Sequence, residues 1–294
     1  MRSETFASRI GPVLTIVATI IVIWYAAAVW MNAPFQRDLD RRGDVTSTTM
    51  EFIGKTLSQP KPIVPAPHQV AQNVFENTFL RKVTSNRSLV YHSWVTLSST
   101  LAGFAFGTLL GVLIAVGIVH VKALDRSLMP WIIASQTVPI LAIAPMVVVV
   151  LAAINVTGLI PKALISTYLS FFPVAVGMVK GLRSPDIIQL DLMRTYNASR
   201  WQTFWKLRVP ASMPFLFTSM KVAVAASLVG AIVAELPTGA AAGIGSKLLA
   251  GSYYSQTIDM WAALIAGSVL AAMLVTIVGI GARLIDRRMG VRPA

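Results

Sequence analysis

The sequence contains no cysteine and few charged residues. Its 294 residues include 12 Asp or Glu, 25 Lys or Arg and three His. Without cysteine, disulfides and thiolate metal ligands are excluded, and His68, His92 and His120 lack the spacing of metal ligands, so we expect no metal site. Charged residues make up 13% of the chain, whereas soluble domains contain about 25%. With a mean hydropathy of +0.68, this deficit indicates a membrane protein.

Motifs for catalysis and nucleotide binding are also missing. The sequence has no HExxH motif, no paired acids within an apolar run and no Walker-type loop. The glycines that follow Glu235 lack the Gly-Lys-Ser/Thr ending of a phosphate-binding loop. We therefore expect a chain that is not an enzyme and that binds no cofactor itself.

What the sequence does contain is six apolar runs, each long enough to cross a bilayer. A spanning helix needs about 20 residues, and backbone groups in lipid must be satisfied within the segment. The sequence therefore predicts an all-α integral membrane protein with six transmembrane helices, the first of them an uncleaved helix. The fourth run is the shortest and contains Pro173. The runs are residues 11–31, 94–119, 129–154, 163–180, 211–235 and 259–284.

The formal charge of +13 raises the possibility of nucleic-acid binding, but the cations lie at the ends of the apolar runs instead of forming one patch. Lys and Arg in short loops mark the cytoplasmic side of a membrane. Two short loops contain only Lys162 and Lys247, whereas the alternate connections are rich in cations. We therefore predict both termini and a loop at 182–210 to be cytoplasmic, and no nucleic acid as a partner. The predicted parts are 1–31 (N-terminus and first helix), 32–93 (external segment), 94–284 (core of five helices) and 285–294 (cytoplasmic tail).

Small residues recur at four-residue intervals in two of the runs. This spacing lets membrane helices approach closely, so we expect it to serve helix packing, with a subunit interface as the alternative. The residues are Gly103, Gly107, Gly111 and Ala115 in the second run, and Ala226, Gly230 and Ala234 in the fifth.

Three residues are candidates for a translocation pathway. Gln136 and Pro139 belong to a proline-rich run, which either lines a pathway or is only kinked to shape the bundle. Glu235 ends the fifth run. An acid near bilayer depth is energetically costly, so its presence indicates a role in a gate or pathway. The alternatives for Glu235 are a solvated interfacial carboxylate or a partner of Lys247.

Residues 187–209 form an amphipathic, basic stretch between two apolar runs. The apolar pattern breaks around Asn197, which tolerates a left-handed turn, and Ser199 is a good helix cap. We predict two short helices that meet at a corner, the second ending before Pro210. Such a stretch either fixes topology, rests on lipid headgroups, or docks a partner.

The spacing within this stretch resembles the EAA loop of the permease subunits of binding-protein-dependent ABC importers. That pattern is Glu-Ala-Ala, three residues, Gly, nine residues, Ile, one residue, Leu-Pro. Here Asp191 stands in the place of Glu, Asn197 in the place of Gly, and Val209-Pro210 in the place of Leu-Pro. All four positions of the Glu-Ala-Ala-Gly core are substituted. The resemblance implies a coupling helix that docks on a cytoplasmic ATPase, with these candidate residues: Asp191, Arg194, Asn197, Arg200, Trp201, Leu207 and Pro210.

Other segments resemble the nitrate/sulfonate/taurine branch of this family. They are "PAPHQVAQNVFENTF", "QTVPILAIAPMVVV", "FFPVAVGMVKGLRSPD" and "VAELPTGAAAGIGSKLL". The last is most similar to relatives assigned to pyrimidine precursors of thiamine or to riboflavin. Sulfonate, taurine or nitrate is the alternative substrate, and a stand-alone channel or secondary carrier is the alternative class.

The resemblance also implies an architecture and partners. The fold would be the type I (MetI-like) permease core in a bacterial inner membrane. The partners would be ATPase subunits that use the ATP, an extracytoplasmic solute-binding protein, a second permease subunit that is identical or different, and membrane lipid.

Overall fold

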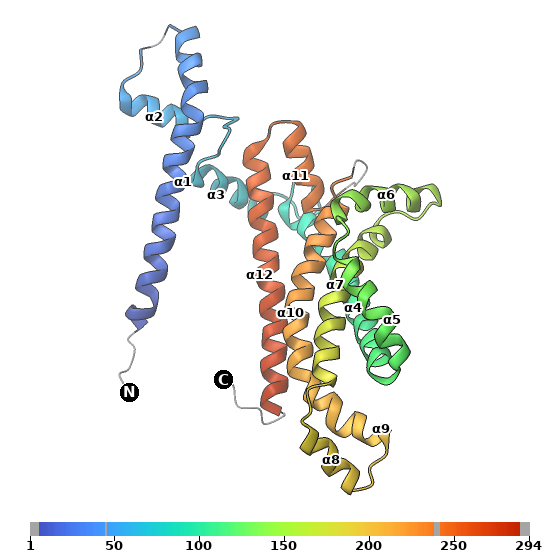
Figure 1. Cartoon of the computed structure of the whole chain (residues 1–294). Helices are drawn as coiled ribbons and strands as arrows, with labels where there is room; N and C mark the ends of the chain where they lie inside the picture. The colour runs from blue at the N-terminus through green and yellow to red at the C-terminus, as the bar shows by residue number, and fades with distance from the viewer. Residues whose placement is uncertain (1–5, 45, 238–241, 289–294) are drawn as a thin grey trace. The chain divides into compact units, whose positions relative to one another are not determined.

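The computed structural model describes residues 6–44, 46–237 and 242–288 (Figure 1). Every regular element within those residues is a helix, which confirms the predicted all-α class. Arg2 and Arg292, which contribute to the predicted cytoplasmic charge, and Thr238–Ala241 of the predicted glycine-rich loop lie outside the described residues. The helices are α1 (Phe6–Arg42), α2 (Thr49–Leu57), α3 (Pro67–Phe75), α4 (Leu89–His120), α5 (Lys122–Ser135), α6 (Ile140–Ala153), α7 (Leu159–Leu182), α8 (Ile187–Thr195), α9 (Arg200–Thr203), α10 (Val209–Ala234), α11 (Ile244–Tyr253) and α12 (Thr257–Arg288), with π-helical turns η1 (Glu76–Leu80) and η2 (Phe204–Arg208).

Five of the predicted spans are confirmed as helices long and apolar enough to cross a membrane. They cover Gly11–Arg42, Leu89–His120, Leu159–Leu182, Arg200–Ala234 and Thr257–Ile285. The first helix continues to Arg42, well past the predicted end at Met31, and includes Pro34.

The remaining predicted span, residues 129–154, is not one straight helix. It consists of α5 and α6, which meet at an angle of 96°. Pro139 has no N–H to donate and disfavours helical backbone at Val138, so the chain leaves the helix before Pro139 and begins a new helix after it. Pro130 and Pro145, by contrast, lie inside α5 and α6.

The described chain divides into two compact units. The first comprises the residues up to Val90 together with Lys247–Ala266, and the second comprises Tyr91–Ser246 together with the residues from Gly267 onward. Each unit is described by itself.

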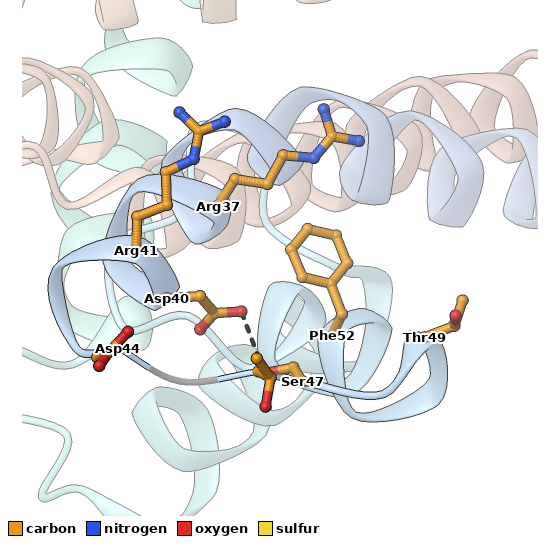
Figure 2. Close-up of a pocket in the computed structure, with 8 residues that line it drawn as sticks. Arg37, Asp40, Arg41, Asp44, Ser47, Thr49 and Phe52 are labelled. Atoms are coloured by element: carbon orange, nitrogen blue, oxygen red, sulfur yellow. Dashed lines mark hydrogen bonds between the residues drawn. The ribbon is translucent and has the colours of Figure 1, made fainter.

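In the first unit, α2 folds back beside the end of α1. The Ser47 hydroxyl donates to the Asp40 carboxylate at 3.1 Å, and the Lys55 ammonium donates to the same hydroxyl at 2.7 Å. The Arg37 guanidinium lies over the Phe52 ring at 5.9 Å from its centre. These contacts enclose a shallow hollow between α1 and α2 (Figure 2).

The same unit ties α1 to the chain that follows α2. The Asn32 amide donates to the Val64 carbonyl at 2.7 Å and accepts from the backbone nitrogens of Ile63 and Val64. The Trp24 ring stacks on the Trp261 ring of α12, with centroids 4.8 Å apart. The start of α12 is thereby fixed beside α1.

In the second unit, the stripes of small residues bring three helices together. A Cβ added at Gly111 of α4 would lie 2.7 Å from the Phe171 carbonyl of α7, and one added at Gly230 of α10 would lie 2.8 Å from the Ser166 Cα of α7. Side chains at these positions would force the helices apart. The stripes therefore serve packing within the chain, as predicted, and α7 packs closely against both α4 and α10.

Candidate functional site

Two groups of candidate residues lie at opposite ends of α10. Its 26 residues rise about 1.5 Å each, so the ends are separated by about 39 Å. The segment before α10 contains the predicted docking residues except Pro210, which lies in α10 itself, and Glu235 directly follows the last residue of α10.

At the first end, α8 and α9 form a corner that we call the elbow (residues 187–203). Asn197 has a φ of 50°, in the left-handed region, and turns the chain between the two helices. The Ser199 hydroxyl accepts from the Gln202 backbone nitrogen at 3.2 Å, while the Gln202 side chain accepts from the Ser199 nitrogen at 2.9 Å. This capping box begins α9. The predicted pair of helices and their corner are confirmed.

The prediction that the second helix ends before Pro210 is wrong. The chain continues from α9 through η2 into α10, and Pro210 lies in the first turn of α10, where a proline is tolerated. The Val209 nitrogen donates to the Phe204 carbonyl, five residues back instead of four. This π-helical turn leads the helix to the proline without interrupting it, so Arg200–Ala234 is one helix of 35 residues.

A buried aromatic side chain directly after the elbow anchors it to the bundle. Phe204 is 5% exposed, and its ring packs edge-on against His120 at the end of α4, with centroids 4.9 Å apart. The Arg208 guanidinium reaches the Leu182 carbonyl at the end of α7 at 3.5 Å. The elbow is thus held to both α4 and α7, and it projects beyond the ends of α7 and α10 (Figure 1).

The outer surface of the elbow is charged and aromatic. The Arg194 guanidinium lies 2.9 Å from the Asp191 carboxylate, and both side chains are exposed. Trp201 is 68% exposed and Tyr196 is 76% exposed. Large aromatic and Arg side chains in an exposed group are typical of protein interfaces. Of the predicted docking residues, Asp191, Arg194, Asn197, Arg200 and Trp201 share this surface, whereas Leu207 is half-buried in η2 and Pro210 belongs to α10.

At the other end of α10, the Glu235 carboxylate is completely buried. It accepts hydrogen bonds from the Thr96 hydroxyl, at 2.8 and 3.1 Å to its two oxygens, and from the Gly245 nitrogen at 3.0 Å. Its charge is compensated by the Lys162 ammonium at 3.4 Å, and Lys162 is itself 11% exposed. Both alternatives stated for Glu235 are wrong, because its carboxylate is not solvated and Lys247 lies instead 3.9 Å from Asp259.

The chain around Gly243 closes over this carboxylate. The Lys162 ammonium donates to the Ala242 carbonyl at 2.9 Å, and the Ile244 nitrogen donates to the Thr96 hydroxyl at 2.9 Å. The Gly243 nitrogen lies 3.0 Å from His92 Nδ1. We call these groups, together with Glu235 and the Gly245 nitrogen, the Glu235 network.

Two glycines make the network possible. Gly243 has a φ of +132°, and a Cβ there would overlap the Glu235 carboxylate. A Cβ at Gly245 would lie 2.7 Å from the Glu235 Cβ. The two glycines thus allow the chain to approach Glu235 more closely than residues with a Cβ could.

Gln136 and Pro139 take no part in the Glu235 network. Gln136 ends α5, Pro139 precedes α6, and both are exposed at the break between these helices. Lys162 and Thr96 are the partners that sequence reasoning missed. In the sequence, Lys162 is visible only as a cation in a short loop. A buried acid at the end of a span requires a compensating cation, and this requirement is the signal that points to Lys162.

Among the described residues, five helices of spanning length and one bent pair indicate a multi-pass membrane protein. The chain belongs to the family described as "Binding-protein-dependent transport system inner membrane component", which matches residues 107–291. It is therefore a transmembrane permease subunit of an ABC importer.

Curated relatives agree with this assignment. A probable ABC transporter permease protein of Haemophilus influenzae is 30% identical over 215 residues, which cover 73% of this chain and 82% of the relative. ThiX of Halalkalibacterium halodurans, a formylaminopyrimidine transport permease, is 29% identical over 66% of this chain and 73% of its own. RibX of Chloroflexus aurantiacus, a riboflavin transport system permease, is 27% identical over 80% of this chain and 84% of its own.

A solved structure supports the fold. The MetNI methionine ABC transporter in an inward-facing conformation superposes with a TM-score of 0.59 at 16% identity, over 67% of this chain and 95% of that chain. This likeness confirms the predicted MetI-like, type I permease fold.

Proposed function

We propose that this chain forms the translocation pathway of an ATP-driven importer of a small organic solute and is driven through its elbow. Two permease subunits would enclose the pathway, a solute-binding protein would deliver the solute from outside, and two ATPase subunits would bind the elbows from the cytoplasm. Both termini are cytoplasmic in this arrangement. ATP-driven closure of the ATPase pair would then bias the bundle between two conformations.

The observation that carries this proposal is the exposed elbow. Trp201 and Tyr196 expose aromatic surface beside the Asp191–Arg194 pair, while Phe204 fixes the same segment to the bundle. A surface that binds a partner and is anchored to the spanning helices is suited to transmit force. Leu207 and Pro210 contribute by continuing α9 into α10 and not by direct contact.

The test uses the absence of cysteine in the chain. A single cysteine at Trp201 should form cross-links to the co-expressed ATPase, and an impermeant thiol reagent should label it only after the cells are permeabilised. Trp94→Cys is a matched control. Trp94 is 67% exposed, close to the 68% of Trp201, and lies near the start of α4. It should react in intact cells and form no cross-link to the ATPase. Labelling of Trp201→Cys in intact cells would contradict the proposed orientation.

For the solute we propose a pyrimidine, a thiamine precursor or a riboflavin-like heterocycle. The similarity to ThiX and RibX supports this choice, and aliphatic sulfonates, taurine or nitrate are the alternative, since other relatives are named for sulfonates and nitrate. A thermal-shift screen of the associated solute-binding protein against these solutes decides between them. ATP-dependent uptake by the assembled complex is expected, and full uptake by this chain alone without ATP would favour a channel or carrier.

A further inference from the structure

A cavity of about 500 Å³ lies beside the Glu235 network in the second unit. It is formed by α4, α6, α7 and the loop that precedes α7. Most of its wall is apolar. Its lining includes Tyr91, Val95, Ser98, Ser99, Val148 and Lys162.

Two serine hydroxyl groups of the wall, those of Ser98 and Ser99, are already committed as donors. The Ser98 hydroxyl donates to the Val95 carbonyl at 2.8 Å, and the Ser99 hydroxyl donates to the Thr96 carbonyl at 3.0 Å. A hydroxyl has one proton to donate and two lone pairs. These serines are therefore left to accept hydrogen bonds.

Lys162 differs from the rest of the wall in being charged, and it still has a proton to donate. Its ammonium has three N–H groups, and two of them are directed to the Ala242 carbonyl at 2.9 Å and the Glu235 carboxylate at 3.4 Å. Among the described residues that line the cavity, no other is charged.

The charge of Lys162 is neutralised by Glu235, which lies outside the cavity wall. Glu235 is completely buried and does not line the cavity, so its negative charge is present while its oxygens are inaccessible to a ligand. The pair presents an N–H donor with no net charge. An anion in the cavity would lose its hydration beside an ion pair that carries no net positive charge, which is unfavourable in a low-dielectric site.

The walls suit a flat, uncharged ring. Val95 and Val148 offer apolar contact, and Tyr91 offers an aromatic ring at the edge. A heteroaromatic ring presents two apolar faces and an edge with acceptor nitrogens or carbonyl oxygens. Such a ring would bury its faces against the apolar wall and receive a hydrogen bond at its edge.

We propose that this cavity is a solute-binding site for an uncharged heteroaromatic ring, with Lys162 donating a hydrogen bond to a ring nitrogen or carbonyl oxygen. Glu235 acts as a positioning residue, because it fixes the Lys162 ammonium and cancels its charge. This proposal rests on the proposed function, since it assigns a site within the pathway of the same permease.

The experiment uses the permease–ATPase complex in nanodiscs without the solute-binding protein. Riboflavin and 4-amino-2-methylpyrimidine serve as neutral probes, and nitrate and methanesulfonate as anionic probes, with binding measured by equilibrium dialysis. We expect a neutral probe to bind and the anions not to bind. Lys162→Met should weaken binding of the neutral probe by about tenfold or more, the effect of losing a buried hydrogen-bond donor. Lys247→Met is the matched control, because Lys247 is also a largely buried, ion-paired lysine but does not line the cavity, and it should leave binding unchanged.

Two further variants separate binding from folding. Lys162→Met leaves the Glu235 charge unpaired, so the double variant with Glu235→Gln should recover thermal stability without recovering binding. Glu235→Gln alone removes the compensating charge and should produce measurable nitrate or methanesulfonate binding. The proposal is overturned if neither neutral probe binds, if the anions bind the unaltered complex more tightly, or if Glu235→Gln leaves the preference unchanged. Each of these results is compatible with ATP-dependent uptake by the full complex, so the proposed function is tested separately.

Discussion

The Arg183 guanidinium lies 2.8 Å from the Asp125 carboxylate. Arg183 directly follows α7, before the elbow, and Asp125 lies in the first turn of α5. The pair therefore brings the α4–α5 turn and the α7–α8 turn to the same end of the bundle. Both turns belong to the cation-rich connections of the sequence, as an alternating topology requires.

A charge swap tests whether this pair positions the elbow. Both side chains are partly exposed, so we expect a small effect on stability and a clear effect on coupling. Arg183→Asp should reduce ATP-driven uptake in vesicles, and adding Asp125→Arg should restore it. Arg126→Ala, at the exposed neighbouring position, should leave uptake unchanged. Failure of the swap to restore uptake would exclude the pair from this role.

The corner residue of the elbow predicts a second pair of variants. Asn197 has a φ of 50°, which glycine adopts freely and proline, fixed near −65°, does not. Asn197→Gly should preserve co-purification with the ATPase, whereas Asn197→Pro should abolish it. Equal co-purification of the two variants would show that the corner does not shape the docking surface.

Thr96 predicts a loss of stability in the Glu235 network. Thr96→Val removes the donor to both carboxylate oxygens and the acceptor of the Ile244 nitrogen, and should lower the free energy of unfolding by about 1–3 kcal/mol. Thr100→Val is the control, because Thr100 is equally buried on the same helix and its hydroxyl donates to the Thr96 carbonyl of its own helix. Thermal unfolding in detergent should show a clearly larger loss for Thr96→Val.

Gly243 predicts a steric effect in the same network. Gly243→Ala places a Cβ on the Glu235 carboxylate at a φ of +132°, and should destabilise the protein by about 1–3 kcal/mol or more. Gly54→Ala is the contrasting variant, because Gly54 lies inside α2 with open space around its Cα. It should be neutral or stabilising by up to about 1 kcal/mol. Comparable melting temperatures for the two variants would contradict the close approach at Gly243.

Local signals in the sequence were sufficient to predict much of this structure. Asn197 and Ser199 predicted the corner and the helix cap, because their effects act within a few residues. The glycine spacing of α4 predicted a packing stripe, because helical periodicity places these glycines on one face of the helix. Long apolar runs predicted the spans for the same reason.

The features that could not be predicted depend on distant residues or on backbone register. The partner of Glu235 is Lys162, 73 residues earlier in the chain, and only the packed helices bring the two together. Pro139 indicates a kink in this run, but the angle of 96° depends on how α6 packs on α7 and α10. Pro210 predicts a helix end, and the π-helical turn that avoids this end has no reliable pattern in a single sequence.

The unbroken helix from Arg200 to Ala234 has a consequence for how the two ends of the permease are coordinated. Each residue of an α-helix advances about 1.5 Å and turns about 100°, so the helical phase of Glu235 is fixed by that of the elbow. One inserted residue anywhere between them would swing either the carboxylate away from Thr96 or Phe204 away from His120. The number of residues in this helix therefore determines whether the contacts at both ends, Glu235 with Thr96 and Phe204 with His120, can form together.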